Sequence, residues 1–503
     1  MIQNILEYLE ASAASCPEKA AFEDLETSCT YAQVLDNAKR IGSALGAVLP
    51  QNAPVPVLME KEAWTLNVFM GAVCAGCFYT LVEPEQPVDR ILTILDTLEA
   101  EVVVTSEKLL EKVQGLGFKG QILVAEELKE ASVDERLLAR RRRDFCDVDP
   151  LYTNFTSGST GVPKGVVVSH RSVIDFTEHF TRIFGIGRED VIGNQAPFDF
   201  DVSVKDIYPA LKTGATLEVI PKKFFSVPKK LLDFLDDRKV TNLTWAVSAL
   251  CIISMLKGFK YKLPKSIKRV MFSGEVMPVK HLNYWRSYLP DALYVNLYGP
   301  TEITCNCTYY ILDREFAEDE VLPIGQAFPN ERVFLLDEED RPVSEPDVLG
   351  EICVSGTALA LGYYRNWEKT EEVFVQNPLN HRYLEPIYRT GDLGRYDEKG
   401  ELYYVTRKDF QIKHMGHRIE LGEIETAFQA LDGISRVCCI YDEPNTKIIG
   451  FYVGERSSKE IISLLAEKLP RFMIPNVFRK VESMPVTKNG KIDRKALMAE
   501  YQS

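Results

Sequence analysis

The chain has 503 residues, which is too long for one hydrophobic core and predicts roughly two to four domains or subdomains. A hydrophobic fraction of 46% and a charged fraction of 26% are ordinary for a globular protein. The formal net charge of −14 argues against nucleic acid as a main partner, because nucleic acid binding needs a basic surface.

The spacing of the cysteines and histidines indicates neither a set of disulfides nor a zinc site. The eleven cysteines lack paired spacing, and the six histidines form no zinc pattern. Cys74 and Cys77 make a C-x-x-C, but they lie in an apolar stretch, so buried thiols are the better interpretation. The N-terminal residues are typical of an amphipathic helix and not of a signal peptide, and no apolar run is long enough to span a membrane. We therefore expect a cytoplasmic protein without membrane insertion.

The order of predicted elements favours an α/β fold. Through the first half, segments of helical period alternate with short β-branched runs such as 102–105. This alternation is typical of layered subdomains with largely parallel sheets. After about Glu320, short strands separated by acidic residues and prolines predict a small β subdomain. Mixed helix and strand return from about Phe410, so we place the main domain boundary near Asp409.

Residues 156–165, here named the phosphate loop, combine four hydroxyl side chains, three glycines and one lysine. Glycines allow positive φ, so several amide N–H groups can converge on one anion, while hydroxyls and an ammonium add donors and charge. The common P-loop differs, because its lysine directly follows a glycine. The alternative is a plain surface turn. The candidate phosphate-binding residues are Thr156, Ser157, Gly158, Ser159, Thr160, Gly161 and Lys164.

The second chemical stretch is 296–302, with the sequence Asn-Leu-Tyr-Gly-Pro-Thr-Glu. Its glycine and proline force a turn. A turn alone does not explain the aromatic residue before it or the Thr-Glu after it. Tyr298 can stack on a purine, Thr301 can donate to a phosphate, and Glu302 can hold Mg²⁺ through hard oxygen ligands.

Three further stretches, 388–393, 406–425 and 485–494, each have a plain structural explanation when considered alone. Asp392 fits a tight turn, and Lys491 follows an Asn-Gly pair that is typical of a solvated turn. Together with 152–170 and 296–302 they resemble, in the correct order, the motifs of the adenylate-forming superfamily. That superfamily comprises acyl-CoA synthetases, luciferases and the adenylation domains of nonribosomal peptide synthetases. One departure is Thr406, where the family usually has glycine.

The resemblance covers essentially the whole chain and implies a fold. We expect a large N-terminal adenylation core at 1–409, made of two α/β-layered subdomains and a small β-barrel subdomain. A small mobile α+β C-terminal domain at 410–503 would carry the catalytic lysine. Because no residue follows Ser503, we expect no attached condensation, carrier or thioesterase module.

The resemblance also implies roles for single residues. Asp392 would accept both ribose hydroxyls, Asp409 would be the hinge, and Lys491 would contact the α-phosphate and the substrate carboxylate. The implied catalytic residues are Thr156, Lys164, Glu302 and Lys491, with Glu302 also the metal ligand. The implied nucleotide-binding residues outside the phosphate loop are Gly274, Glu275, Asn296, Leu297, Tyr298, Gly299, Thr301, Glu302, Asp392, Arg407 and Lys491.

Residues 198–209 resemble the substrate-pocket segment of the family. An aspartate at the position of Asp201 pairs with the substrate α-ammonium in amino-acid-activating members, and aryl-acid and fatty-acid members lack it; the alternative is a helix N-cap. Motif alignment gives a pocket of Asp201, Val202, Lys205, Thr244, Met271, Ser273, Leu297, Cys305, Asn306 and Lys491.

The sequence around Lys205 is compatible with two kinds of substrate side chain. A buried ammonium is costly without a partner, so it suggests a substrate with its own anion, such as aspartate or glutamate. Alternatively, Lys205 reaches solvent along its stem, or shares Asp201 or Asp206, and the pocket takes a small apolar amino acid such as alanine.

The implied activity has two steps. An amino acid reacts with ATP and Mg²⁺ to give aminoacyl-AMP and pyrophosphate, and the acyl group then passes to the phosphopantetheine thiol of a separate carrier protein. A D-alanine–carrier protein ligase is an alternative suggested by 206–209, although such ligases usually have cysteine at the position of Ser273. An acyl- or aryl-CoA synthetase is disfavoured by Asp201. A nucleotide-binding regulator without turnover is disfavoured by Glu302 and Lys491.

Overall fold

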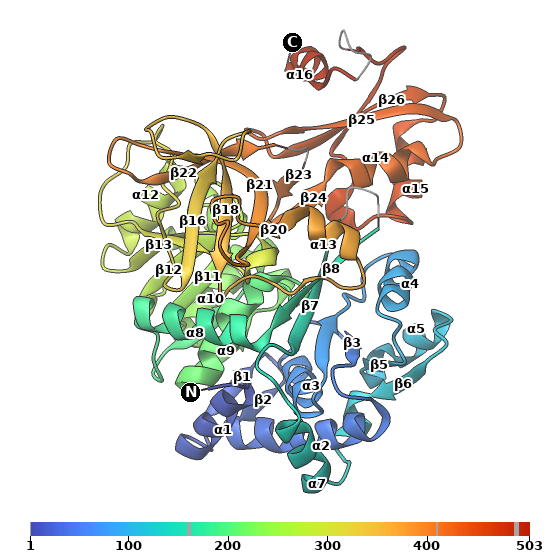
Figure 1. Ribbon diagram of the computed structural model, residues 1–503, viewed down its shortest axis with the longest axis vertical. Helices are drawn as coiled ribbons and strands as arrows, with labels where there is room; N and C mark the ends of the chain where they lie inside the picture. Colours follow the sequence, from blue (N-terminus) through green and yellow to red (C-terminus); the bar gives the residue numbers. More distant parts are fainter. Residues whose placement is uncertain (1, 158–161, 409–410, 487–491, 503) are drawn as a thin grey trace. The chain divides into compact units, whose positions relative to one another are not determined.

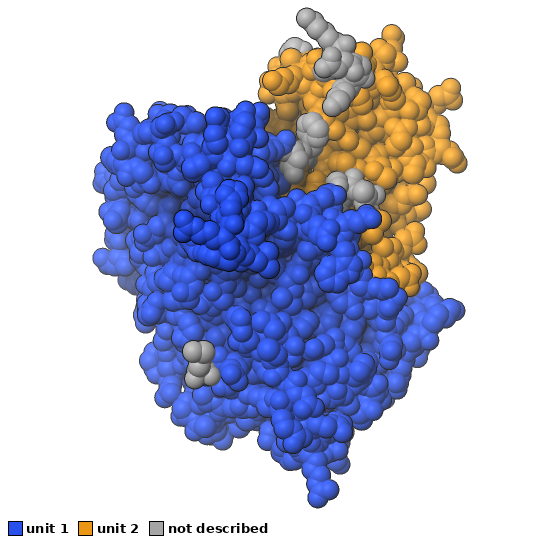
Figure 2. Space-filling view, viewed as in Figure 1, with its two compact units in different colours: residues 1–83, 98–154, 165–408 blue, residues 84–97, 155–164, 409–503 orange. Residues whose placement is uncertain are grey.

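The computed structural model describes residues 2–157, 162–408, 411–486 and 492–502 (Figure 1). The chain divides into two compact units (Figure 2). The first contains Met1–Glu83, Leu98–Asn154 and Gly165–Lys408. The second contains Pro84–Thr97, Phe155–Lys164 and Asp409–Ser503. The assignment of domains to 1–409 and 410–503 stays a prediction, since the second unit also includes two short segments from earlier in the chain.

A nine-stranded sheet forms one layer of the first unit, in the order β15-β14-β13-β12-β11-β9-β10-β1-β2. The run from β13 to β1 is parallel, and the strands at both edges are antiparallel. Parallel strands place their carboxyl ends at one edge, which is where ligands bind in open α/β sheets. The strands are β1 (Ala20–Glu23), β2 (Ser28–Thr30), β9 (Val191–Asn194), β10 (Thr216–Val219), β11 (Asn242–Ala246), β12 (Arg269–Ser273), β13 (Leu293–Tyr298), β14 (Thr308–Ile311) and β15 (Gln326–Ala327).

A second α/β layer contains a seven-stranded sheet in the order β19-β8-β7-β4-β3-β5-β6. Its central strands are buried along nearly their whole length, as expected for parallel strands covered on both faces. The strand predicted at 102–105 is confirmed as β5. The strands are β3 (Pro54–Leu58), β4 (Phe78–Leu81), β5 (Val102–Thr105), β6 (Gln121–Val124), β7 (Pro150–Thr156), β8 (Lys164–Ser169) and β19 (Gly362–Tyr363).

The helices pack closely on these sheets. The longest, α2, begins with a capping box between Thr30 and Gln33, and glycine at position 42 allows a close approach to α3. A Cβ atom on Gly42 would lie 2.7 Å from the Cβ of Cys74. All eleven cysteines are free thiols. The α-helices of the first unit are α1 (Leu6–Ser15), α2 (Tyr31–Val48), α3 (Ala63–Cys74), α5 (Leu110–Gly115), α6 (Ala125–Leu128), α7 (Glu135–Arg143), α8 (His170–Phe184), α9 (Val204–Thr213), α10 (Pro228–Asp237), α11 (Val247–Met255), α12 (Val279–Tyr288) and α13 (Trp367–Val373).

The predicted β subdomain is a small antiparallel sheet in the order β17-β16-β18-β21-β20, with β22 paired to β21. The pairing of β21 with β22 sets Asp392 opposite Arg407. This register brings a predicted nucleotide-binding carboxylate beside a guanidinium. The strands are β16 (Glu331–Leu336), β17 (Pro342–Val343), β18 (Gly350–Gly356), β20 (Phe374–Gln376), β21 (Pro386–Tyr396) and β22 (Leu402–Arg407).

The second unit is α+β, as predicted for the C-terminal part of the chain. Its first hairpin turns at Met415 and Gly416, both with positive φ, as two-residue hairpin turns of the primed type require. Helix α14 packs on the three-stranded sheet β25-β26-β27 through Ile424 and Phe428. No helix within the described ranges is long and apolar enough to cross a membrane. The elements are α4 (Val88–Thr97), β23 (Gln411–His414), β24 (His417–Glu420), α14 (Leu421–Gln429), β25 (Ile434–Asp442), β26 (Lys447–Gly454), α15 (Ser458–Ala466), β27 (Val477–Lys480) and α16 (Arg494–Gln502).

Candidate active site

The substrate-pocket segment leaves β9 as a loop, forms a 3-10 turn at Asp201–Ser203 and continues into α9. Lys205 lies in the first turn of α9 and is only 1% exposed. Its ammonium donates to Ser273 Oγ and to Asn306 Oδ1, both at 2.8 Å. The alternative in which Lys205 reaches solvent is therefore wrong, because the side chain is buried and its ammonium is hydrogen-bonded to Ser273 and Asn306.

Asp206 follows Lys205 and is completely buried. Asn194 Nδ2 donates to its Oδ2 at 2.8 Å. Burial raises the pKa of Asp206 to about 7, although the cations of Lys205 and Lys61 act in the opposite direction. Lys61 donates to the carbonyl oxygen of Gln195 at 2.8 Å, and burial lowers the pKa of Lys61 to about 7. Asp206 and the loop after β9 thus belong to one polar network beneath the pocket segment.

Three further pocket residues come from three adjacent strands of the nine-stranded sheet. Thr244 on β11 lies in register with Met271 on β12, and Leu297 lies on β13. All three side chains are buried. Cys305 Sγ donates to the backbone oxygen of Asp201 at 2.9 Å. The structure thus brings Asp201, Lys205, Ser273, Cys305 and Asn306 together, while Val202 is half-buried on the same 3-10 turn as Asp201.

The chain reverses sharply after Glu302. Thr304 and Cys305 have φ values of 54° and 73°, a conformation that non-glycine residues rarely adopt. The returning chain presses against Gly299, where a Cβ atom would lie 2.5 Å from Asn306 Cα. Only glycine fits at this position. The turn therefore links the nucleotide motif at 296–302 to the substrate pocket.

Asp392 is hydrogen-bonded to two other predicted nucleotide-binding residues. Tyr298 OH donates to its Oδ2 at 2.6 Å, and Arg407 NH1 donates to its Oδ1 at 2.6 Å. Both oxygens of an ionised carboxylate have a second lone pair, so Asp392 retains the capacity to accept further hydrogen bonds. Burial raises the pKa of Tyr298 well above its usual value, and the Asp392 charge adds to that effect.

The other nucleotide-binding candidates border the same strands. Asn296 Nδ2 donates to the carbonyl oxygen of Pro323 at 2.8 Å. Gly274 directly follows β12, and the neighbouring Glu275 accepts from the Ser248 amide at 3.1 Å. Thr301 is half-buried and begins the 3-10 turn Thr301–Ile303.

Glu302 is fully buried, and Tyr363 OH donates to its Oε1 at 2.7 Å. Tyr363 gave no signal in the sequence, because it belongs to no motif; the Ala360 amide, three residues before it, donates to the Glu302 carbonyl oxygen at 2.9 Å. The described residues contain no group of three or more His, Cys, Asp or Glu side chains that could hold a metal ion. A single carboxylate fits Mg²⁺ nevertheless, since Mg²⁺ is commonly held by one or two carboxylates together with substrate phosphates.

Three of the candidate phosphate-binding residues are described, and they belong to the second unit: Thr156, Ser157 and Lys164. Within the described chain, Thr156 Oγ1 is buried and has no hydrogen-bond partner, which suits a donor to phosphate. Ser157 Oγ instead contacts β24, donating to Arg418 O at 2.9 Å and accepting from Glu420 N at 3.1 Å. The predictions for Gly158, Ser159, Thr160, Gly161, Asp409 and Lys491 lie outside the described residues.

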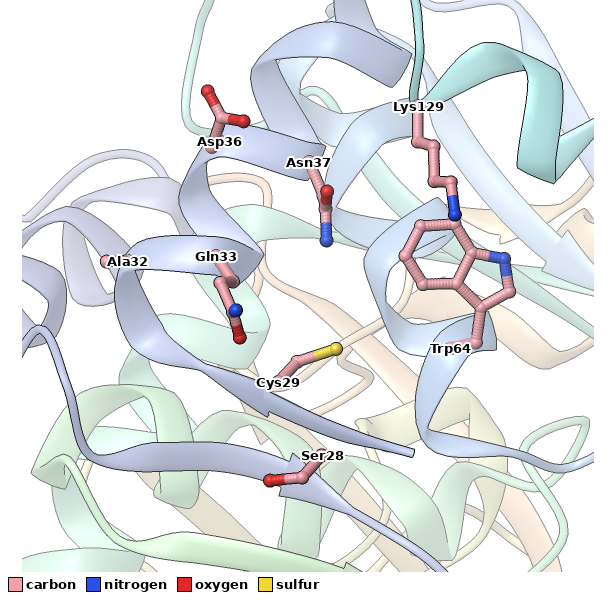
Figure 3. Close-up of a pocket in the computed structure, with 8 residues that line it drawn as sticks. All are labelled: Ser28, Cys29, Ala32, Gln33, Asp36, Asn37, Trp64 and Lys129. Carbon is pink, nitrogen blue, oxygen red and sulfur yellow. The ribbon is translucent and has the colours of Figure 1, made fainter. Parts of the chain in front are cut away.

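A separate pocket of about 400 Å³ opens between α2, α3 and β2 (Figure 3). The Lys129 ammonium lies 5.5 Å from the centre of the Trp64 ring at one side of it. None of the predicted site residues lines this pocket. Its lining residues are Ser28, Cys29, Ala32, Gln33, Asp36, Asn37, Trp64 and Lys129.

Comparison with known proteins agrees with this geometry. The family model described as AMP-binding enzyme matches residues 9–364. Surfactin synthase subunit 1 of Bacillus subtilis (strain 168) is 31% identical over 98% of this chain, which spans only 14% of that protein. The D-alanine--D-alanyl carrier protein ligase of Staphylococcus aureus (strain bovine RF122 / ET3-1) is 31% identical over 98% of both proteins.

Among solved structures, holo-PA1221, an NRPS protein containing adenylation and PCP domains, superposes with a TM-score of 0.85 at 25% identity. The match covers 99% of this chain and 84% of that one. It supports the expected arrangement of two α/β sheets, a small antiparallel sheet and an α+β C-terminal part. The family model alone covers well over half of the sequence. The chain belongs to the family of AMP-binding enzymes.

Proposed function

We propose that this protein activates an amino acid with ATP as aminoacyl-AMP, releases pyrophosphate, and transfers the aminoacyl group to the phosphopantetheine thiol of a separate carrier protein. The observation that carries the proposal is the close approach of Gly299 to Asn306. It joins the nucleotide residues Tyr298 and Asp392 to the pocket residue Lys205 within one unit. Membership of the AMP-binding enzyme family supports the use of ATP.

In the first step, the amino acid carboxylate attacks the α-phosphorus of ATP and the bond to the β-phosphate oxygen breaks. Two anions must approach each other, so the site needs donors and positive charge and no general base. Lys491 supplies a cation at the reacting phosphate, and the phosphate loop, with Thr156 Oγ1 and Lys164, orients the β- and γ-phosphates. Asp392 accepts the ribose hydroxyls. Glu302 holds Mg²⁺, which neutralises phosphate charge when bound.

In the second step, the carrier thiol attacks the carbonyl carbon of the adenylate and AMP leaves. This step needs access for a long pantetheine arm, which the first step does not. We place the change between the two steps at Asp409, as a rotation of the C-terminal domain about that residue. In this assignment, Lys491 acts in adenylate formation and Asp409 in the rotation that precedes thiol transfer.

The substrate is an amino acid whose α-ammonium binds Asp201. Two candidates for its side chain have support. An acidic side chain is favoured by Lys205, because its buried ammonium is oriented in the predicted pocket by hydrogen bonds to Ser273 Oγ and Asn306 Oδ1. D-Alanine is favoured by the 31% identity to the D-alanine--D-alanyl carrier protein ligase, which the chain matches along nearly its whole length. Ser273 stands where such ligases usually have cysteine.

Pyrophosphate exchange into ATP across a panel of amino acids in both configurations tests the proposal. We expect exchange with one amino acid or a small related set, followed by loading of a phosphopantetheinylated carrier protein. Exchange with fatty or aryl acids and release of AMP dependent on coenzyme A would instead indicate a CoA synthetase. No exchange with any acid would indicate a nucleotide-binding regulator and contradict the proposal.

A further inference from the structure

Helix α4 belongs to the second unit although it lies near residue 90 of the sequence. Its Arg90 forms an ion pair with Glu423 of α14, with NH1 2.5 Å from Oε1. The side chains are 10% and 2% exposed. An ion pair this enclosed is retained only where its geometry is well fixed, and removal of one partner leaves a buried charge. We name this ion pair the clasp.

The clasp lies directly beside the contact between Ser157 and β24. Glu420 is the last residue of β24 and the residue before α14, and Glu423 lies in the first turn of that helix. Acidic side chains in a first turn are favourable because of the helix dipole. Since strand and helix are continuous here, fixing Glu423 on α4 also fixes the Glu420 amide that donates to Ser157 Oγ.

The hydroxyl of Ser157 can donate only one hydrogen bond, since it carries one proton. In this structure the proton goes to Arg418 O. A phosphate oxygen would need the same proton, because phosphate oxygens only accept. Binding of β24 and binding of ATP phosphates by Ser157 therefore compete. This arrangement therefore belongs to a stage of the cycle at which Ser157 donates to no phosphate, either before ATP binds or after pyrophosphate has left.

We propose that Arg90 is a positioning residue for the thiol-transfer step, acting through Glu423 to hold β24 on Ser157. The inference rests on the proposed function, since it assigns the clasp to one of the two steps. Release of pyrophosphate frees the Ser157 hydroxyl, which then donates to Arg418 O of β24. The clasp holds β24 in this position while the acyl group moves to the thiol. Arg90 touches neither ATP nor substrate in this scheme.

Hydrogen exchange tests the clasp without any turnover. In the wild-type protein without nucleotide, we expect the Glu420 amide to be protected, and ATP with Mg²⁺ to accelerate its exchange. Arg90→Met should accelerate it by about tenfold or more without nucleotide, as expected where a local contact opens more often. Arg90→Lys, which keeps the charge, should restore most of the protection. The control Arg314→Met removes a half-exposed ion pair with Glu320 in the first unit and should leave Glu420 unchanged.

Kinetics of the two steps provide the second readout. We expect Arg90→Met and Glu423→Gln to keep pyrophosphate exchange within about threefold of wild type and to slow transfer from preformed adenylate by at least about tenfold. The reversed pair Arg90→Glu with Glu423→Arg should recover part of the transfer rate, which loss of folding would not allow.

Three results would overturn the inference. In the first, the Glu420 amide of Arg90→Met stays as protected from hydrogen exchange as in the wild type. In the second, a variant slows pyrophosphate exchange and thiol transfer equally while the Glu420 amide stays protected. In the third, ATP leaves the hydrogen exchange of the wild-type Glu420 amide unchanged. If a variant proves generally unstable, Arg90→Lys and the reversed pair decide, since a purely structural ion pair would give no difference between the two steps. Absence of pyrophosphate exchange in the wild type would reject the proposed function, while the exchange of the Glu420 amide would still decide whether the clasp holds β24.

Discussion

Replacement of Lys205 by methionine removes a buried ammonium and keeps an unbranched side chain of similar volume. Lys205 Nζ donates at 2.8 Å to both Ser273 Oγ and Asn306 Oδ1. The variant leaves these two oxygens without that donor, which costs stability of about 1–3 kcal/mol for each group. It also removes a cation whose burial is itself unfavourable, so the two effects on folding partly cancel.

The effect on catalysis depends on the substrate. If the substrate carries a carboxylate that pairs with Lys205, losing one partner of a buried charge pair costs about 2–5 kcal/mol. At 1.4 kcal/mol for each factor of ten, kcat/KM for the acidic amino acid falls by about 30-fold to several thousand-fold. If the substrate is uncharged, Lys205 makes no pair with it, and we expect a change within about tenfold.

The assay is pyrophosphate exchange with wild type and Lys205→Met over acidic, polar and apolar amino acids in both configurations. Lys212→Met is a matched control, because Lys212 lies on the same helix and donates to Glu178 Oε2 at 2.6 Å, remote from Ser273 and Asn306. With an acidic substrate, we expect the wild type to prefer an acidic amino acid and the variant to lose that preference. A wild-type preference for alanine that Lys205→Met leaves unchanged would refute the reasoning.

Three further predictions follow from the proposed chemistry. Lys491→Ala should reduce adenylate formation by about 10²–10³-fold, the scale for one charge-stabilising donor, and change transfer from preformed adenylate far less; equal loss of both steps contradicts the assignment. Asp409→Pro should permit adenylation and abolish carrier loading, because proline fixes φ at the hinge; an unchanged loading rate removes Asp409 from that role. Burial raises the pKa of Asp206 from 3.8 to about 7, so the folded protein binds this proton more tightly than the unfolded chain. The free energy of unfolding of wild type should therefore fall, relative to Asp206→Asn, by up to about 4 kcal/mol as pH rises through that interval, and parallel curves in urea titrations would contradict this.

The sequence alone predicted the layers of the fold because its signals are local. Buried parallel strands appear as short apolar runs, as at 102–105, and acidic turns separate the strands of the antiparallel sheet. The resemblance to the adenylate-forming superfamily pointed to Asp392 and Arg407, which the structure places opposite each other on β21 and β22. Their proposed roles toward ATP stay predictions.

The contacts that the sequence did not reveal join distant segments. The partners of Lys205 lie 68 and 101 residues away and become neighbours only through the order of β12 and β13 in the sheet. Tyr363 OH donates to Glu302, and Ala360, on the segment that leads into β19, donates to the Glu302 backbone. Arg90 and Glu423 are separated by 333 residues. No local periodicity carries such information, since each contact depends on how whole elements pair or pack.

Under the proposed function, the turn at 299–306 couples nucleotide recognition to substrate recognition. Gly299 is required because the returning backbone leaves no room for a side chain, with Asn306 Cα 2.5 Å from the position of a Cβ atom. The same return strains Thr304 and Cys305 and brings Asn306 Oδ1 to the Lys205 ammonium. A shift of the nucleotide motif would therefore move the group that orients Lys205. In the proposed function, the orientation of Lys205 in the predicted substrate pocket therefore depends on a backbone turn that begins in the predicted nucleotide motif.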